Sequence, residues 1–309
     1  MFELMSTRYS DYGINTISDV EIFKGKVTIK NPKKTIYHLR LDFNTSCSAW
    51  DTITFFRKNV LPTINNPFIF IISGEDLTFP KQLDNRWQEP YQLELIKGVY
   101  NDVLHHPLLI HFFIENRDEF HEKTSSLPLG LNPREMPNYN IDYIIKFMNN
   151  FTTINSRPLK VISIHRMRPG DREIINNLNH THWKEYVINS GNFQRDSWWN
   201  LLQSFPFIIC AHGGGIDPCP KVWEALCVGC IPIIKSSAMD DVYSEFPIVI
   251  VDSWNSNTIS ITNLLKWREQ FSGYYDNPDL RNKWVHKLYL NYWKDKIRNK
   301  ISTSEDLHP

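Results

Sequence analysis

Apolar segments rich in β-branched and aromatic residues alternate along the chain with segments of helical spacing. In the first half this pattern predicts strands at residues 35–42, 68–73 and 108–114, with a helix near residues 49–61 between the first two. Because strands that alternate with helices form parallel sheets, the pattern predicts an α/β protein.

The second half continues the alternation over more elements. The predicted strands cover residues 159–164, 186–189, 207–211, 231–234 and 248–251, and the predicted helices cover residues 141–151, 171–179, 197–203 and 221–228. This is the order of a Rossmann-like sheet. A proline-rich polar stretch, residues 124–138, separates the two series, so we expect one domain at residues 1–135 and a second at 136–309. The tail, residues 259–300, has helical spacing and carries tryptophans expected to pack on the sheets, which leaves open that it crosses back to the first domain.

Composition narrows the range of partners. The 34 Lys and Arg residues balance the 34 Asp and Glu residues, so the formal net charge is zero. A general nucleic-acid binder needs a basic surface that neutralises many phosphates, and this chain has no such excess. Small anionic ligands remain compatible with the composition. No apolar run approaches the roughly 18 residues of a membrane span, and residues 1–19 show neither a secretory nor a transit signal, so we expect a soluble, cytoplasmic protein.

The five cysteines do not predict a metal centre. Cys210, Cys219, Cys227 and Cys230 are close in sequence and end in a Cys-x-x-Cys, a pattern that also occurs in zinc sites. However, Cys210 closes an apolar run, and Cys227 and Cys230 flank the step into another, which is typical of small buried side chains. An odd number of cysteines also argues against a disulfide framework, so we expect a reducing compartment. We expect no bound metal and no cofactor.

The glycine loop at residues 212–218 is the most informative segment. His212, Gly213, Gly214 and Gly215 follow a predicted buried strand and precede a predicted helix. Ligands of open α/β sheets bind at the carboxyl ends of strands, where glycines let the backbone approach a phosphate. A glycine run is also what a tight turn requires. The Gly-x-Gly-x-x-Gly spacing of dinucleotide-binding oxidoreductases is absent, which disfavours that class.

Charged residues near the glycine loop are candidates for further contacts with a ligand bound there. Glu224 lies early in the predicted helix, where its carboxylate would accept two hydrogen bonds from sugar hydroxyls or would interact with the helix dipole. Arg166 and Arg172 follow the first strand of the second domain at the same sheet edge, and we expect them to stabilise the negative charge of a diphosphate bound at the glycine loop. The alternative is a surface loop whose arginines pair with neighbouring acids.

These motifs together resemble the exostosin-like glycosyltransferases of family 47, and the similarity is greatest to their short, virus-encoded relatives. The resemblance rests on residues 212–217 (HGGGID), 223–226 (WEAL) and 229–234 (GCIPII), continues through 235–254 with Ser236 in its KSS segment, and extends more loosely upstream to 41–42, 73–76, 106–116 and 127–131. It covers about two thirds of the chain.

The resemblance implies a GT-B fold, in which two Rossmann-like domains face a central cleft. The first domain would bind a glycan acceptor and the second a nucleotide-sugar donor, with inversion at the anomeric carbon and no metal. The UDP-sugars considered first are UDP-xylose, UDP-glucuronic acid and UDP-galactose. Lys221 departs from the family, which commonly has arginine there, so its phosphate contact would be a point charge. The expected location becomes the host-cell cytoplasm if the chain is viral.

An inverting transfer needs a base for the acceptor hydroxyl. Asp76 and Asp42 follow apolar runs of the first domain and are the candidates, with Glu75, His38 and His111 in reserve. Asp76 is preferred because Gly74 permits a tight turn before it. We therefore expect an inverting glycosyltransferase, and the alternative is a catalytically inactive sugar- or nucleotide-binding module of the same fold.

Overall fold

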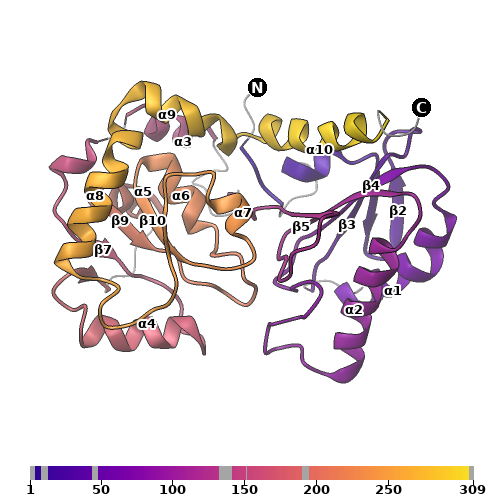
Figure 1. Ribbon diagram of the computed structural model, residues 1–309, viewed down its shortest axis with the longest axis horizontal. Coiled ribbons are helices and arrows are strands. Elements are labelled where there is room, and N and C mark those ends of the chain that lie inside the picture. The colour runs from indigo at the N-terminus through magenta and orange to yellow at the C-terminus, as the bar shows by residue number, and fades with distance from the viewer. Residues whose placement is uncertain are drawn as a thin grey trace. The chain divides into compact units, whose positions relative to one another are not determined.

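Two units, each built around its own β-sheet, make up the chain (Figure 1). The computed structural model describes residues 4–7, 13–43, 48–131, 141–150, 152–189 and 195–305. Unit 1 comprises Met1–Leu129, Gly214–Asp217 and Tyr289–Pro309, and unit 2 comprises Gly130–Gly213 and Pro218–Leu288. The chain therefore crosses between the units four times, at residues 129/130, 213/214, 217/218 and 288/289.

The sheet of unit 1 has six strands within the described residues, in the order β2-β1-β3-β4-β5-β6. The strands are β1 (Val20–Phe23), β2 (Lys26–Ile29), β3 (Ile36–Arg40), β4 (Phe68–Ser73), β5 (Leu109–Ile114) and β6 (Thr124–Ser126). β1 and β2 form an antiparallel hairpin whose turn residues Lys24 and Gly25 both have positive φ, as a tight two-residue turn requires. The pairings from β1 through β3 to β6 are parallel.

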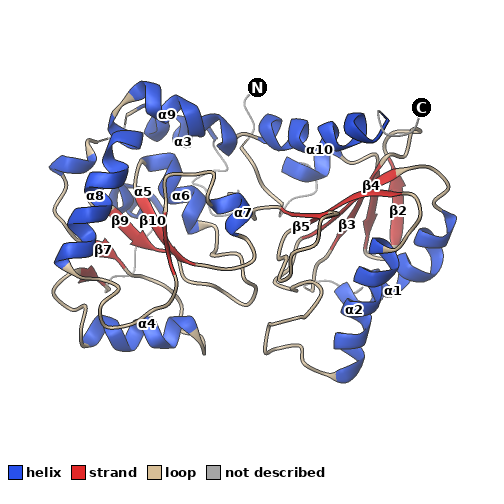
Figure 2. Cartoon of the chain, viewed as in Figure 1, coloured by secondary structure: helices blue, strands red, loops and turns tan. Residues whose placement is uncertain are grey.

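Helices cover both faces of this sheet. From β3 to β6 the strand order never reverses, so right-handed crossovers place α1 (Ala49–Phe55) and α2 (Pro90–Leu104) on the same face (Figure 2). Helix α1 begins with a capping box of Ser48 and Asp51. On the other face α10 (Leu290–Glu305) contacts β4 and β5, and it buries Leu290, Trp293 and Ile297.

The sheet of unit 2 is parallel throughout its described strands, in the order β11-β10-β9-β7-β8. The strands are β7 (Val161–Ile162), β8 (Val187–Ile188), β9 (Phe207–Ile209), β10 (Ile231–Lys235) and β11 (Val249–Val251). The chain moves from β7 outward to β8 and then returns to place β9 on the other side of β7. This reversal makes the sheet doubly wound, with a topological switch point between β7 and β9.

The helices of unit 2 connect and cover these strands. They are α3 (Ile141–Asn149), α4 (Asp171–His180), α5 (Arg195–Ser204), α6 (Lys221–Val228), α7 (Asp240–Tyr243), α8 (Ile261–Asp276) and α9 (Pro278–Val285). Helix α6 is buried at every position after Lys221 and ends at Gly229, whose φ of 73° is the left-handed conformation of a helix C-terminus. Because α6 is enclosed, its position relative to β9 and β10 is fixed by packing.

The prediction of an α/β protein with parallel sheets is confirmed in both units. The structure adds the β1–β2 hairpin, α2, β6 and the short helix α7, which the sequence pattern did not indicate. The helix predicted at residues 141–151 ends at Asn149, and Phe151 lies outside the described residues.

Two histidines named as reserve bases lie in the core of unit 1. His38 is fully buried, and its Nε2 and Nδ1 lie 2.8 Å from Ser73 Oγ and 3.3 Å from Asn15 Oδ1. Burial, with the nearby charges of Arg40 and Lys30, lowers the pKa of His38 to about 3. Burial likewise lowers the pKa of His111 to about 3. Both side chains are therefore neutral in the folded protein at neutral pH.

These histidines predict acid destabilisation. An unfolded histidine has a pKa near 6.5, so between pH 6.5 and about 3 the unfolded state binds more protons than the folded state. The free energy of unfolding should consequently fall as the pH falls through this window, by up to about 1.4 kcal/mol per pH unit for each histidine. Urea unfolding between pH 7.5 and 4.5 measures the slope.

His38→Gln should make that slope shallower, because glutamine does not titrate. His105→Gln is the matched control, since His105 is exposed on the surface of the same unit. An unchanged slope in His38→Gln would show that protonation of His38 is not coupled to unfolding.

Candidate functional site

The carboxyl ends of β3, β4 and β5 bring both predicted carboxylate bases to one edge of the unit 1 sheet. Asp42 follows β3 and Asp76 follows β4. Gly74 makes the turn after β4 with a φ of 111°, and a Cβ there would lie 2.4 Å from Leu41 O, so only glycine suits the position. Glu75 is held within this edge, because its Oε1 accepts a hydrogen bond of 2.8 Å from the Phe43 N–H.

Asp76 belongs to a charged cluster with Arg86 and Asp84. Arg86 Nη2 lies 2.6 Å from Asp76 Oδ2, and the Arg86 Nε donates to both oxygens of Asp84 at 3.0 Å. Asp84 is buried, whereas 29% of the Asp76 side chain is exposed. The hydrogen bond with Asp84, followed by the bond and charge of Asp76, raises the pKa of Arg86 despite its partial burial. The guanidinium therefore stays charged and fixes the orientation of Asp76.

Three half-buried aromatic rings flank this cluster. Phe43 stacks on Trp87 with ring centroids 4.4 Å apart, and Trp50 is tilted against Phe43 and nearly perpendicular to Trp87. The Arg86 guanidinium lies over the Trp87 ring at 4.2 Å. We call Phe43, Trp50 and Trp87 the aromatic cluster. The aromatic cluster was not predicted from the sequence, because its three rings come from separate segments that share no motif.

The glycine loop is divided between the two units. Gly213 belongs to unit 2, while Gly214–Asp217 belongs to unit 1. Asn116, which follows β5, holds the unit 1 part: its Oδ1 accepts hydrogen bonds from the N–H groups of Ile216 and Asp217 at 3.1 and 2.9 Å. Asp217 Oδ2 in turn accepts from the Leu129 N–H at 3.0 Å.

Close packing explains two of the three glycines. A Cβ on Gly214 would lie 2.0 Å from Arg86 Nη2 and 2.7 Å from Asp76 Oδ2, and one on Gly215 would lie 2.3 Å from Asn116 Oδ1. The backbone thus approaches side chains of its own unit at these positions. The sequence predicted that the backbone at these glycines approaches a phosphate. Phosphate binding by the loop stays a prediction.

In unit 2 the predicted donor residues gather at the switch point between β7 and β9. Arg172, in the first turn of α4, donates from Nε to His212 O at 2.8 Å and from Nη1 to Arg166 O at 3.3 Å. Lys221, the first residue of α6, donates to Ile164 O at 2.7 Å. These bonds join the loop after β7 to the loop after β9, so the structure brings Arg172, His212 and Lys221 together.

Lys235, which was not predicted to have a role, adds a further cation at the carboxyl edge of the unit 2 sheet. Lys235, at the end of β10, pairs with Asp171 Oδ1 at 2.6 Å, and His212 Nδ1 lies 3.5 Å from Asp171 Oδ2. Burial lowers the pKa of His212 to about 4 despite the attraction of Asp171, so His212 is neutral at pH 7. Arg172, Lys221 and Lys235 therefore supply the positive charge, and we call these three residues the cationic edge.

The other donor candidates are placed differently. Glu224 is 3% exposed, and its Oε2 accepts a hydrogen bond of 2.7 Å from Trp198 Nε1 of α5. Ser236 follows β10 and donates to Asp240 Oδ2 at 2.6 Å, which anchors the start of α7. Arg166 is exposed in the loop after β7. The structure thus puts Glu224 inside the unit, and Arg166 on its surface.

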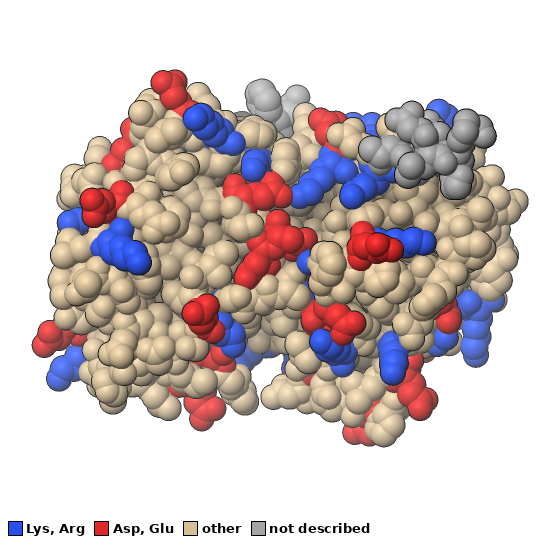
Figure 3. Space-filling view, in the orientation of Figure 1, with Lys and Arg blue, Asp and Glu red and all other residues tan. Residues whose placement is uncertain are grey.

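The chemistry open to the protein also depends on metal ligands, on apolar helices and on surface charge. Among the described residues, no group of three or more His, Cys, Asp or Glu side chains could hold a metal ion. Within the same residues no helix combines the length and the apolarity needed to cross a bilayer. On the face shown in Figure 3, acidic and basic side chains are interspersed, in agreement with the balanced composition.

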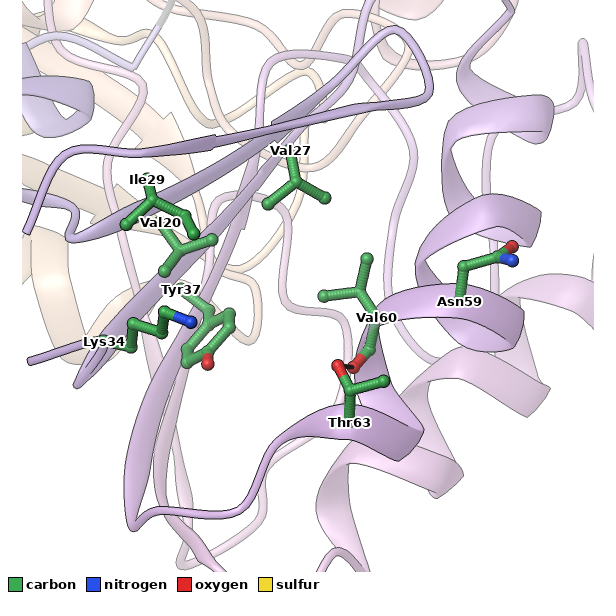
Figure 4. A pocket seen from close by; sticks show the side chains of 8 residues that line it. All are labelled: Val20, Val27, Ile29, Lys34, Tyr37, Asn59, Val60 and Thr63. Carbon is green, nitrogen blue, oxygen red and sulfur yellow. Dashed lines mark hydrogen bonds between the residues drawn. The ribbon is translucent and has the colours of Figure 1, made fainter. Parts of the chain in front are cut away.

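A separate cavity of about 200 Å³ opens in unit 1 near the amino end of β3 (Figure 4). Its lining residues are Val20, Val27, Ile29, Lys34, Tyr37, Asn59, Val60 and Thr63. The Lys34 side chain points toward Tyr37 in this cavity. Since Lys34 and Tyr37 lie at the start of β3 and the candidate carboxylates follow strand ends, the cavity is distinct from the candidate site.

Comparisons with known proteins give similar solved structures, three of which are described here, and no relative by sequence. No protein-family model matches the chain, and no curated protein matches it. Sucrose-phosphate synthase from Thermosynechococcus elongatus is 10% identical over 88% of this chain and 75% of its own, with a TM-score of 0.45. α,α-Trehalose 6-phosphate synthase from Burkholderia multivorans is 9% identical over 89% of this chain and 72% of its own, with a TM-score of 0.43. TarM is 10% identical over 82% of this chain and 58% of its own, with a TM-score of 0.37.

The packing of Gly215 against Asn116 can be tested by adding one methyl group. Gly215→Ala should lower the free energy of unfolding by about 1–3 kcal/mol, because Asn116 or the loop must move and hydrogen bonds to Ile216 and Asp217 are strained. Denaturant unfolding measures the change.

Gly273→Ala is the matched control, since its Cβ would meet nothing closer than 3.8 Å in the helix α8. It should be neutral or stabilising by up to about 1 kcal/mol. Equal effects of the two substitutions would contradict the packing role of Gly215.

Proposed function

We propose that the chain is an inverting, metal-independent glycosyltransferase of the GT-B type. It transfers a sugar from a UDP-sugar to a glycan hydroxyl, and UDP-xylose is the first donor to consider. The observation that carries the proposal is the cationic edge at the switch point of unit 2. In doubly wound sheets ligands bind outside the carboxyl ends of the strands at the switch point. Arg172, Lys221 and Lys235 supply there the charge that a nucleoside diphosphate requires.

The cationic edge also has the chemistry of a leaving-group site. When the glycosidic bond to the donor breaks, negative charge develops on the diphosphate, and fixed cations that already face it lower the energy of the transition state. Arg172 is held in place by two backbone carbonyls and Lys221 by one, so little reorganisation accompanies that change. Arg166, exposed in the adjacent loop, and the Gly213 backbone complete the donor contacts of the proposal.

Glu224 is left out of direct donor contact in this proposal. Its burial and its bond to Trp198 favour a positioning role, in which the carboxylate fixes α6 against α5 and so fixes Lys221 at the start of α6. Ser236 similarly anchors α7 through Asp240. Neither residue needs to touch the donor for the cationic edge to bind it.

The edge of the unit 1 sheet is the proposed acceptor site. Aromatic rings provide apolar faces against which the C–H faces of sugar rings pack, while carboxylates accept hydrogen bonds from sugar hydroxyls. The aromatic cluster and Asp76 offer both kinds of group, and they are linked through Arg86. Asp76, oriented by Arg86, is the proposed base that removes the proton of the acceptor hydroxyl, and Asp42 is the alternative.

The second candidate is a sugar- or nucleotide-binding module without turnover. It is retained because Lys221 occupies a position where the exostosin-like glycosyltransferases commonly have arginine. A lysine binds phosphate as a point charge and lacks the two-pronged geometry of arginine. The two candidates differ in one product: an enzyme releases UDP from a UDP-sugar, whereas a binding module does not.

The donor site is tested by measuring UDP binding and UDP release. Wild-type protein should bind UDP and release it from at least one of UDP-xylose, UDP-glucuronic acid and UDP-galactose when a simple glycoside is present. The rate should stay within about twofold in EDTA, since no metal takes part in the proposed mechanism. Activity lost in EDTA and restored by manganese or magnesium would contradict the metal-free mechanism, and binding without release would favour the second candidate.

Arg172→Met should weaken UDP binding by roughly 10-fold or more, because a hydrogen bond to a charged group contributes about 1.5–3 kcal/mol. Arg172→Lys should have a smaller effect, since it keeps the charge. Lys266→Met is the matched control: it also removes one cation, from an exposed position on α8. Calorimetry measures the affinities, and equal affinities for Arg172→Met and the control would exclude Arg172 from the donor site.

The base is tested in unit 1. Asp76→Asn should lower turnover by roughly 100-fold or more and leave UDP affinity unchanged, because general-base assistance typically contributes about 10² to 10⁴. Asp42→Asn should have a mild effect. If Asp42→Asn shows the large loss and Asp76→Asn the mild one, the base is Asp42, and melting temperatures of both variants verify that the fold is intact.

A further inference from the structure

The thiols of Cys210 and Cys219 meet at the two ends of the loop between β9 and α6. Cys210 follows β9, where its N–H donates to Ile233 O at 2.9 Å, and Cys219 precedes α6, where its carbonyl accepts from the Val222 N–H at 3.2 Å. The two side chains are hydrogen-bonded to each other. Both sulfurs are thus fixed by regular elements of unit 2, although nine positions separate them in sequence.

The two thiols differ in exposure and in acidity. Cys210 is fully buried, whereas Cys219 is partly exposed. Burial raises the pKa of Cys210 well above its ordinary value. For Cys219 burial acts in the same direction, but the hydrogen bond with Cys210 and the charges of Lys221 and Arg172 outweigh it and lower the pKa to about 7. The pKa of Cys219 therefore lies in the neutral range, where a fraction of Cys219 is thiolate and the protonated Cys210 donates to it.

The remaining described cysteines provide the contrast. Cys227 and Cys230 are fully buried in and after α6, and burial raises the pKa of each, to about 12 for Cys230. The charge of Glu224 raises the pKa of Cys227 further, and the charge of Arg157 lowers that of Cys230 without outweighing its burial. The reactive character of Cys219 thus comes from its place beside Lys221 and Arg172.

The backbone at Cys219 is also unusual. Its φ is 93°, a conformation that residues with a side chain rarely adopt, and it lies between Pro218 and Pro220. Such a conformation persists only where the surroundings impose it, and it is common at functional positions. Here it belongs to the residue whose sulfur is directed at Cys210.

We propose that Cys219 and Cys210 form a dithiol site that reacts with low-molecular-weight disulfides such as glutathione disulfide. The Cys219 thiolate attacks one sulfur of the disulfide, a new S–S bond forms, and one glutathione leaves as a thiolate. Cys210 then gives up its proton and attacks the Cys219 sulfur of the mixed disulfide. The second glutathione leaves as a thiolate that takes up a proton, and Cys210 and Cys219 are left joined. The two protein thiols are oxidised and one glutathione disulfide is reduced to two glutathione molecules.

The consequence for the protein is a covalent ring over residues 210–219. The ring contains His212 and both halves of the glycine loop, so the oxidised state holds the ends of that loop together regardless of any ligand. Because this chemistry requires no nucleotide sugar, the proposal does not depend on the proposed function.

The test uses the full chain, reduced and then freed of reductant. The protein is incubated with glutathione disulfide at pH 7.5, quenched with an alkylating agent, and mapped by peptide mass spectrometry. We expect Cys210 and Cys219 to lose reactivity together, with one Cys210–Cys219 linked peptide and no retained glutathione. Cys219 should react at least ~10-fold faster than Cys227. Peptide mapping distinguishes Cys47, which lies outside the described residues.

Variants separate the two steps. Cys210→Ser should accumulate a stable glutathione adduct on Cys219, because the second attack has no thiol, and Cys219→Ser should leave Cys210 unmodified. Cys227→Ser is the control and should form the 210–219 link as wild type does. Wild-type protein that keeps glutathione on Cys219, or that leaves Cys219 fully alkylated, would overturn the proposal, and this result needs no variant to fold.

Discussion

The side-chain amide of Asn116 bonds three backbone groups at the edge of the unit 1 sheet. Its oxygen accepts from the N–H groups of Ile216 and Asp217, and its nitrogen donates to Glu75 O at 3.0 Å. Asn116 is 2% exposed, so losing the amide would leave these groups buried without their partner. The placement of the segment Gly214–Asp217, the requirement for glycine at position 215 and the position of the turn after β4 all depend on this one side chain.

The two sheet edges differ in the charge they carry. The carboxyl edge of the unit 1 sheet carries Asp76 and Asp84 around one arginine, together with aromatic rings. The corresponding edge of the unit 2 sheet carries three cations, of which Arg172 and Lys221 donate to backbone carbonyls and Lys235 pairs with Asp171. The strand orders also differ, since only unit 2 has a switch point. The two units are therefore not copies of one ligand-binding design, and the proposed division into acceptor and donor sites follows this difference in chemistry.

The sequence predicted those elements whose apolar pattern is strong and local. The buried strands β4, β5, β9 and β10 stand out as continuous apolar runs, and structure and prediction agree on them within a few residues. The hairpin strand β2 was missed because all four of its residues are exposed at a sheet edge, so burial imposes no pattern on it. Helix α2 was missed because it lies next to a long polar loop, and its amphipathic pattern was not recognised.

The location of a candidate site residue could be predicted where it depends only on a strand end. Arg172 and Lys221 follow strand ends, so the α/β pattern was sufficient to predict that they lie at one sheet edge, and their role in ligand binding stays a prediction. The partner of Glu224 could not be predicted, because Trp198 lies on another helix 26 positions earlier and only packing brings the indole to the carboxylate. The pairing of Asp76 with Arg86 was missed for a similar reason, since it depends on the path of an irregular loop.

The return of residues 289–309 to unit 1 has a consequence for synthesis on the ribosome. Domains usually fold in the order in which they are made. Here residues 130–288, which contain all of unit 2, are translated before α10, whose Leu290, Trp293 and Ile297 cover one face of β4 and β5. The unit that starts first is therefore completed last, and during that interval a nascent chain carries an apolar sheet face that a chaperone or an incorrect partner would find uncovered.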